Sequence, residues 1–142
     1  MESTVTLTEG MAFDAAIGEH HFMIDAKPEV GGMDKGPPPK ELMLTALAGC
    51  ASMDVVSILR KMRVPPETFA VSASADLTDT HPKTFVNMAV KVVATGDVPP
   101  AKLWKAVALS RDSYCGVAAM LRGHGPIHYV VELNGAEVPE PS

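Results

Sequence analysis

The sequence predicts an α+β fold, and three observations support that class. Short segments that alternate apolar and polar residues, as half-buried strands do, occur near both ends of the chain and in its middle. One long and two shorter apolar segments have lengths that are typical of helices. Turn-forming residues separate most of the strands, which favours hairpins over parallel crossovers. The expected element order is βββ-α-ββ-αα-β in a single domain, residues 1–142.

The first 39 residues are expected to form three strands and a long loop. His20 and His21 fall on opposite faces of the third strand, and one solvated face explains them without a ligand role. The loop, residues 27–39, contains three consecutive prolines, which favour an extended polyproline-like segment. Because loops of this length are usually functional or spread over another chain, we expect a partner contact. The three strands are expected at residues 4–8, 11–17 and 20–26.

A helix is predicted at residues 40–63, directly after Pro39, which suits a first helical turn. Between residues 42 and 59 its only charged side chain is that of Asp54. An apolar run of this length raises the alternative of a membrane span, but Asp54, Gly49 and the amphipathic strands on either side argue against it. A helix that is apolar on every face is otherwise buried on every face. One chain of this size cannot easily enclose it, so we expect a homodimer.

The second half of the chain continues the α+β pattern. A turn at residues 80–83 joins two strands as a hairpin. Consecutive prolines end the long helix and precede the next one. The predicted elements are strands at residues 68–79 and 84–95, helices at 101–111 and 115–122, and a last strand at 127–133 before a polar tail.

Composition restricts the classes of function. The chain has 142 residues, of which 46% are apolar and 20% charged, so it can build a core without a disulfide or a metal. The net charge of −5, without a basic run, argues against nucleic-acid and anionic-membrane partners, which require clustered positive charge. The N-terminal segment lacks the basic and apolar regions of an export signal. We therefore expect a cytoplasmic protein.

The two cysteines, Cys50 and Cys115, are 65 positions apart. The histidines show no zinc-finger spacing to either of them, so no metal site is expected. A permanent disulfide is not expected in a reducing compartment. From their positions alone, the cysteines are either buried spectator thiols or a transient redox pair.

Charged residues near both cysteines bear on their reactivity. Asp54 follows Cys50 by one helical turn and should face the same side, where its negative charge would oppose a Cys50 thiolate. Cys115 is expected near the start of a short helix, shortly after Arg111. The helix N-terminus and the guanidinium should lower the pKa of the Cys115 thiol.

Two segments around these cysteines resemble the signatures of one family. Residues 36–54 (GPPPKELMLTALAGCASMD) are similar to the first signature of the OsmC/Ohr family, which comprises osmotically inducible protein C and the organic hydroperoxide resistance proteins. Residues 114–121 (YCGVAAML) are similar to its second signature. The element order matches over essentially the whole chain. The resemblance implies an OsmC-like fold and an intertwined homodimer with two active sites at the subunit interface, each beside the long helix.

The resemblance also implies an activity. In the peroxidase members of this family, the helix cysteine attacks a peroxide and becomes a sulfenic acid, which condenses with the second cysteine to a disulfide. A dithiol or lipoyl-type reductant then restores the thiols. By matching position, Cys50 is the peroxidatic residue and Cys115 the resolving one. We therefore expect a peroxidase for organic hydroperoxides in oxidative stress defence, with no bound cofactor.

The sequence departs from the peroxidase pattern at one charged pair. Those members use an N-terminal arginine and a glutamate that holds it, but here no arginine precedes Arg60. Lys40 occupies the position of the glutamate, with Glu41 beside it, and a lysine lacks the planar fork of a guanidinium. The candidate replacements for the missing cation are His20, His21, Lys27 and Lys35. The alternative function is a non-catalytic OsmC-like protein that binds a small apolar or acyl ligand at the dimer interface.

Overall fold

The structure is a computed structural model that describes residues 1–141. These residues form two compact units, one of residues 1–43 and one that begins at residue 44. Within the described residues there are two β-sheets and three α-helices, which confirms the α+β class. A single domain over residues 1–142 stays a prediction.

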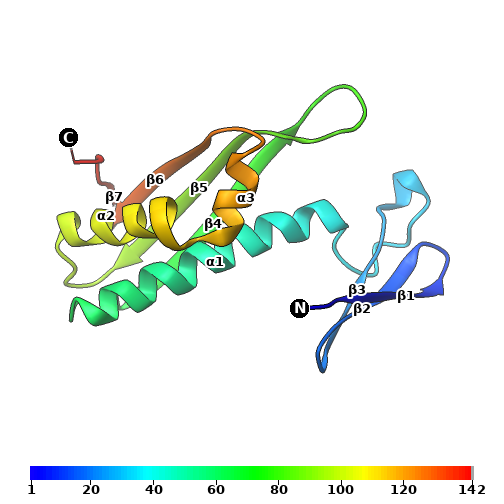
Figure 1. Ribbon diagram of the computed structural model, residues 1–142, viewed down its shortest axis with the longest axis horizontal. Coiled ribbons are helices and arrows are strands. Elements are labelled where there is room, and N and C mark those ends of the chain that lie inside the picture. Colours follow the sequence, from blue (N-terminus) through cyan, green and yellow to red (C-terminus); the bar gives the residue numbers. More distant parts are fainter. Residues whose placement is uncertain (142) are drawn as a thin grey trace. The chain divides into compact units, whose positions relative to one another are not determined.

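The first unit is an antiparallel sheet of three strands in the order β1-β2-β3 (Figure 1). The second strand begins one residue later than predicted because Gly10, with a φ of 54°, and Met11 form the turn before it. The third strand ends two residues earlier than predicted, at Ile24. The elements of this unit are β1 (Thr4–Glu9), β2 (Ala12–Ile17), β3 (His20–Ile24) and one 3₁₀ turn, η1 (Pro28–Val30).

Asp25 directly follows the last residue of β3, and its side chain organises the loop that comes next. Its side chain is buried, and its carboxylate accepts hydrogen bonds from the backbone N–H groups of Ala26 at 2.7 Å and of Met33 and Lys35 at 3.1 Å. Burial raises the pKa of Asp25, but the three N–H donors outweigh burial and hold the pKa below its usual value. The backbone at Gly32 lies so close to the Ala26 carbonyl that a Cβ there would collide with it, so the position requires glycine. The predicted partner contact of this loop stays a prediction.

Helix α1 (Pro39–Lys61) is two residues shorter at its C-terminus than predicted. Arg63 adopts a left-handed conformation, with a φ of 59°, and the N–H of Val64 donates to the Leu59 carbonyl at 3.0 Å. This arrangement closes the helix before the prolines and satisfies one of its last carbonyls.

Only one stripe of α1 is buried in the chain. Its four buried residues recur at every fourth position, whereas Met53 on another face is 76% exposed. The expected burial on every face is therefore not found within one copy of the chain. By length and apolar composition α1 is the one helix among residues 1–141 that could cross a membrane, but core helices of soluble proteins meet the same requirement. The buried residues are Leu47, Ala51, Val55 and Leu59.

The second unit contains a four-stranded sheet in the order β4-β5-β6-β7. The first two strands form the predicted hairpin, and β6 pairs with β5 in parallel. The last strand lies in the predicted polar tail, where the Trp104 indole N–H donates to the Val138 carbonyl at 2.6 Å. The strands are β4 (Thr68–Leu77), β5 (Phe85–Thr95), β6 (Ile127–Leu133) and β7 (Ala136–Glu137).

The helices of this unit cover one face of the four-stranded sheet (Figure 1). Alternate residues of β5, from Met88 to Ala94, are buried against α1, α2 and α3, so the core lies between the helices and the sheet. The predicted helix at residues 101–111 ends earlier because its last residues form a wider π-helical turn. The elements are α2 (Pro100–Leu109), the π turn η2 (Ser110–Tyr114) and α3 (Gly116–Arg122).

Candidate functional site

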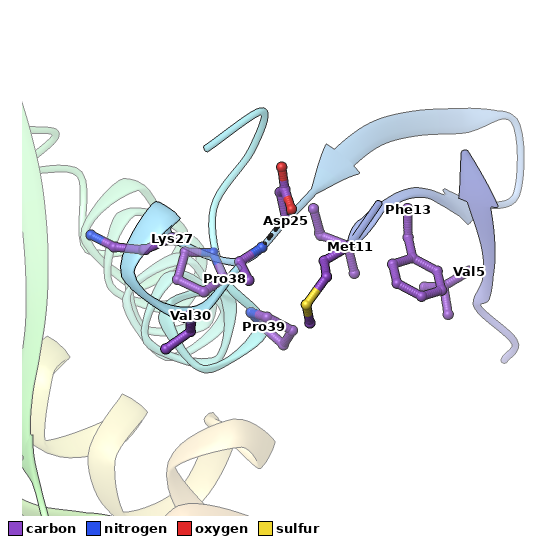
Figure 2. A pocket seen from close by; sticks show the side chains of 10 residues that line it. Val5, Met11, Phe13, Asp25, Lys27, Val30, Pro38 and Pro39 are labelled. Atoms are coloured by element: carbon purple, nitrogen blue, oxygen red, sulfur yellow. Dashed lines mark hydrogen bonds between the residues drawn. The ribbon is translucent and has the colours of Figure 1, made fainter. Parts of the chain in front are cut away.

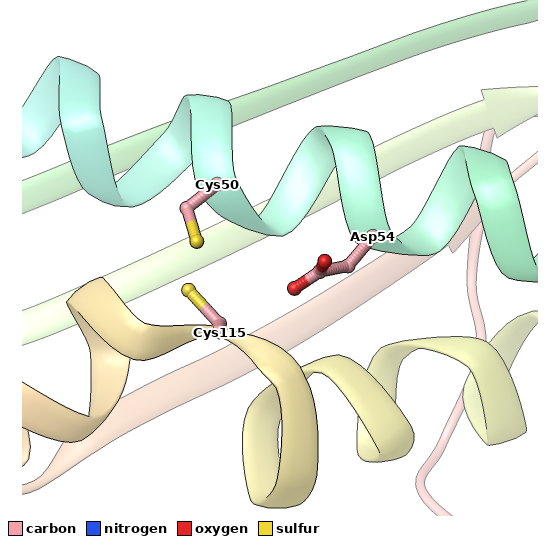
Figure 3. A group of neighbouring side chains, drawn as sticks. All are labelled: Cys50, Asp54 and Cys115. Atoms are coloured by element: carbon pink, nitrogen blue, oxygen red, sulfur yellow. The ribbon is translucent and has the colours of Figure 1, made fainter.

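The fold brings together the two cysteines and one carboxylate of the second unit. Cys50 and Asp54 lie on α1, and Cys115 immediately precedes α3. Both Sγ atoms and a carboxylate oxygen of Asp54 lie within 4.8 Å of one another. Figure 3 shows the two sulfur atoms pointing toward each other across the space between α1 and the segment before α3. Both cysteines are free thiols.

The π turn η2 positions one side of this cluster. The Cys115 N–H donates to the Ser110 carbonyl at 2.9 Å, which closes the turn. The Ser110 side chain is buried, and its hydroxyl donates to the Asp54 carboxylate at 3.0 Å, so it links η2 to α1. Wide turns of this kind are frequent at functional sites. No local sequence pattern indicates a role for Ser110, because its partner is 56 positions away.

The pKa of the Cys115 thiol is raised to about 11, which contradicts the lowered value expected from the sequence. Burial is the largest cause, and the hydrogen bond with Cys50 and the negative charges of Cys50 and Asp54 act in the same direction. The Ala118 N–H donates to Cys115 Sγ at 3.3 Å, and this helix N-terminal contact lowers the pKa. It is too weak to offset burial, since Cys115 is only 3% exposed.

The Arg111 guanidinium, expected to act beside Cys115, is engaged by two carboxylates. It forms hydrogen-bonded ion pairs with Asp112 and Glu140, each at 2.9 Å, and they raise its own pKa. It also lies over the Tyr129 ring, 5.9 Å from the centroid. The buried Tyr129 hydroxyl has no hydrogen-bond partner among the described residues, and burial raises its pKa. No sequence motif marks Tyr129.

The other predicted supporting residues, Lys40 and Glu41, belong to the first unit. Glu41 lies 3.6 Å from the Lys27 ammonium, and Lys40 is exposed. The candidate replacement cations are also in this unit, and three of the four are paired with carboxylates. These pairs are Lys27 with Glu41, Lys35 with Glu9, and His21 with Asp14.

An open pocket of about 350 Å³ adjoins the cysteine cluster on the Asp54 side. It is lined by residues of α1, by Leu109 at the end of α2 and by the exposed Tyr114 of η2. A small molecule can therefore reach Asp54 from solvent.

A second pocket, of about 310 Å³, lies within the first unit (Figure 2). Its lining is almost entirely apolar, and side chains from the strands and from the proline segment enclose it. This volume is at the lower end of the range for small-ligand pockets. The residues drawn around it include Val5, Met11, Phe13, Val30, Pro38 and Pro39.

Comparison with known proteins identifies what this architecture is similar to. A family model described as OsmC-like protein matches residues 32–130. Protein YhfA of Escherichia coli K12 is 35% identical over 124 residues, which cover 85% of this chain and 89% of YhfA. A hypothetical protein from Aquifex aeolicus has a solved structure with a TM-score of 0.83 and 27% identity, covering 94% of this chain and 95% of that one. An organic hydroperoxide resistance protein OsmC from Legionella pneumophila has a TM-score of 0.67 and 16% identity, covering 93% and 97%.

Proposed function

Because the chain belongs to the OsmC-like protein family, we propose that it is a thiol-dependent peroxidase that reduces organic hydroperoxides in oxidative stress defence. The observation that carries this proposal is the approach of the Cys50 and Cys115 sulfurs to within 4.8 Å, although they are 65 positions apart in sequence. The family, and a structural neighbour named as an organic hydroperoxide resistance protein, support a stress-related redox role.

The proposed reaction uses the two sulfurs in turn. The Cys50 sulfur attacks one peroxide oxygen, the O–O bond breaks, the alcohol leaves with a proton, and Cys50 becomes a sulfenic acid. The Cys115 sulfur then attacks the Cys50 sulfur, which forms the disulfide and releases water. An external dithiol, itself oxidised to a disulfide, restores both thiols.

The local geometry supports the second step. A disulfide requires a sulfur separation of about 2.05 Å, so the sulfurs must move closer by less than 3 Å from the 4.8 Å limit. Side-chain rotation of Cys50, which is only half-buried, can supply much of this movement. The open pocket reaches Asp54, whose carboxylate lies within 4.8 Å of both sulfurs. Supporting roles for Lys40, Glu41 and Arg111 stay predictions.

The test is a stoichiometric reaction of the reduced protein with cumene hydroperoxide. We expect both thiols to be consumed and the intact chain to lose two hydrogens in mass. Cys50→Ser should not react, whereas Cys115→Ser should accumulate a sulfenic acid that dimedone traps. Ser72→Ala, on the exposed face of β4, serves as the control and should behave as the wild type. Two free thiols after peroxide treatment of the wild type would rule out this function.

The apolar pocket of the first unit favours one alternative, a non-catalytic protein that binds a small apolar or acyl ligand. Native mass spectrometry of the purified protein distinguishes the two functions. A retained ligand together with unreacted thiols after peroxide treatment would support the binding protein.

A further inference from the structure

The Asp54 carboxylate is a half-buried anion without a basic partner. Its hydrogen bond comes from the neutral Ser110 hydroxyl, and within residues 1–141 no Lys, Arg or His side chain forms an ion pair with it. Arg111, on the neighbouring turn, is occupied by Asp112 and Glu140. Buried charges ordinarily pair with a cation or coordinate a metal, and the Asp54 side chain is partly buried.

The two thiols beside this carboxylate complete a set of donor atoms for a soft or borderline cation. Zn²⁺ binds thiolate sulfur at about 2.3 Å and carboxylate oxygen at about 2.0–2.2 Å in a tetrahedral arrangement. Two sulfurs on one such ion are therefore about 3.8 Å apart, which falls within the 4.8 Å that spans the three donor atoms here. Ca²⁺ and Mg²⁺, which prefer oxygen ligands, do not fit two sulfurs.

We propose that the reduced protein binds one Zn²⁺ ion through Cys50 Sγ, Cys115 Sγ and the Asp54 carboxylate. Binding forms two Zn–S bonds and one Zn–O bond and releases the two thiol protons, without oxidation or reduction. With three protein ligands, the fourth position of the tetrahedron would be taken by water. Spacing rules gave no sign of this site, because its ligands come from α1 and from a segment 65 positions away.

Zinc binding and disulfide formation exclude one another, because each requires both sulfur atoms. The zinc form is therefore protected against peroxide, and removing zinc with a chelator restores reactivity. Protection by zinc is separate from the proposed peroxidase reaction. The reaction uses the two sulfurs, whereas zinc binding also requires the Asp54 carboxylate.

The experiment is a titration of the reduced full-length protein with Co²⁺, followed by displacement with Zn²⁺. We expect one equivalent of Co²⁺ to bind with tetrahedral and thiolate-to-cobalt absorption bands, which Zn²⁺ abolishes. Cys50→Ser and Cys115→Ser should each weaken the thiolate bands. Asp54→Asn should lower zinc affinity at least tenfold, since even outer-shell partners contribute about 10–100-fold. Asp97→Asn, an exposed carboxylate, is the matched control and should bind as the wild type does.

Three outcomes would overturn the proposal: no saturable one-to-one binding, cobalt bands without thiolate absorption, or unchanged affinity in Asp54→Asn. Asparagine retains an oxygen that can accept the Ser110 hydrogen bond, and circular dichroism checks that each variant is folded. The oxidised wild type should not bind until a phosphine reduces the disulfide. Metal binding without peroxidase activity would show that the proposed function has failed. Peroxidase activity without metal binding would show that the zinc proposal has failed.

Discussion

Cys115 occupies a position in which local and tertiary effects on a thiol oppose one another. It is the N-cap of α3, where its sulfur accepts the Ala118 N–H, yet it is 3% exposed and lies beside a second thiol and a carboxylate. The helix has seven residues, so its dipole is small. Burial therefore determines the protonation state, and Cys115 is a neutral thiol at neutral pH.

We predict that Cys115 titrates near pH 11 in the reduced wild type and at a lower pH in Cys50→Ala. Removing Cys50 removes one hydrogen bond and one negative charge, but burial, the largest cause, remains. The pKa of the Cys115 thiol in the variant should therefore stay above its usual value of 9.0. Alkylation of the Cys115 peptide as a function of pH, measured by mass spectrometry, gives both values. Rapid alkylation of Cys115 at neutral pH in the wild type would contradict the prediction.

The same shift predicts how stability depends on pH. The pKa is higher in the folded than in the unfolded state, so the contribution of this thiol is fully present below about pH 9 and is lost as pH rises to about 11. Denaturant unfolding should be measured at both ends of this pH range. The free energy of unfolding should decrease more with pH in the wild type than in Cys115→Ser. Equal losses in the two proteins would contradict this assignment.

At the scale of elements, the buried Asp25 side chain stabilises the loop after β3, together with backbone hydrogen bonds within that loop. The Asp25 carboxylate accepts hydrogen bonds from three backbone N–H groups that lie one, eight and ten positions after it in the sequence. Its order should therefore depend on the charge and shape of this one carboxylate.

We predict that Asp25→Asn increases hydrogen exchange at the amides of Ala26, Met33 and Lys35 while leaving the second unit unchanged. The amide group replaces one accepting oxygen with a donor that faces these N–H groups. Hydrogen exchange followed by mass spectrometry measures the effect. Asp34→Asn is the matched control, because Asp34 is exposed in the same loop and its φ of 54° is tolerated by asparagine.

The pKa of Asp25 adds a pH dependence to this element. Because the pKa is lowered in the folded state, the stabilisation is present above the usual carboxyl pKa and is lost as pH falls through the folded value. The protection of the loop amides, measured as the exchange rate relative to the intrinsic rate at the same pH, should therefore fall in acid in the wild type. In Asp25→Asn this protection should already be low at neutral pH.

At the scale of the whole molecule, apolar surface remains that one copy of the chain does not bury. In the first unit Val5, Leu7 and Ile17 are at least half exposed, and on α1 Met53 is 76% exposed. The first unit has 43 residues around a three-stranded sheet, which is close to the size below which a chain rarely forms a stable core alone. A second copy of the chain, as the resemblance to the OsmC/Ohr family implies, would cover such surface.

We predict that the protein sediments at twice the chain mass of 15.0 kDa and that its melting temperature rises with protein concentration. Met53→Lys should weaken the association, because a charge would be buried at the interface. Val130→Lys is the control, since Val130 lies on the outer face of β6. Sedimentation equilibrium measures both variants, and a wild-type monomer at all concentrations would contradict the prediction.

The fold class, the family and most elements followed from the amino-acid sequence alone. Alternation along residues 68–77 predicted β4, and the two cysteine-containing segments carried the resemblance that the comparisons confirm. These features are local in sequence, because side-chain periodicity and short motifs are fixed by neighbouring residues. Element ends differed by one or two residues where a single backbone conformation, such as that of Arg63, decided them.

Only the tertiary structure decided which side chains meet and what environment they share. It placed Cys115 beside Cys50, added the Ser110 hydroxyl to Asp54, and reversed the direction of the Cys115 pKa shift. Burial and long-range contacts within the chain depend on segments that are 56 to 65 positions apart, which no local pattern encodes. Desolvation depends on everything packed around a group, so the local helix-terminus rule failed at Cys115.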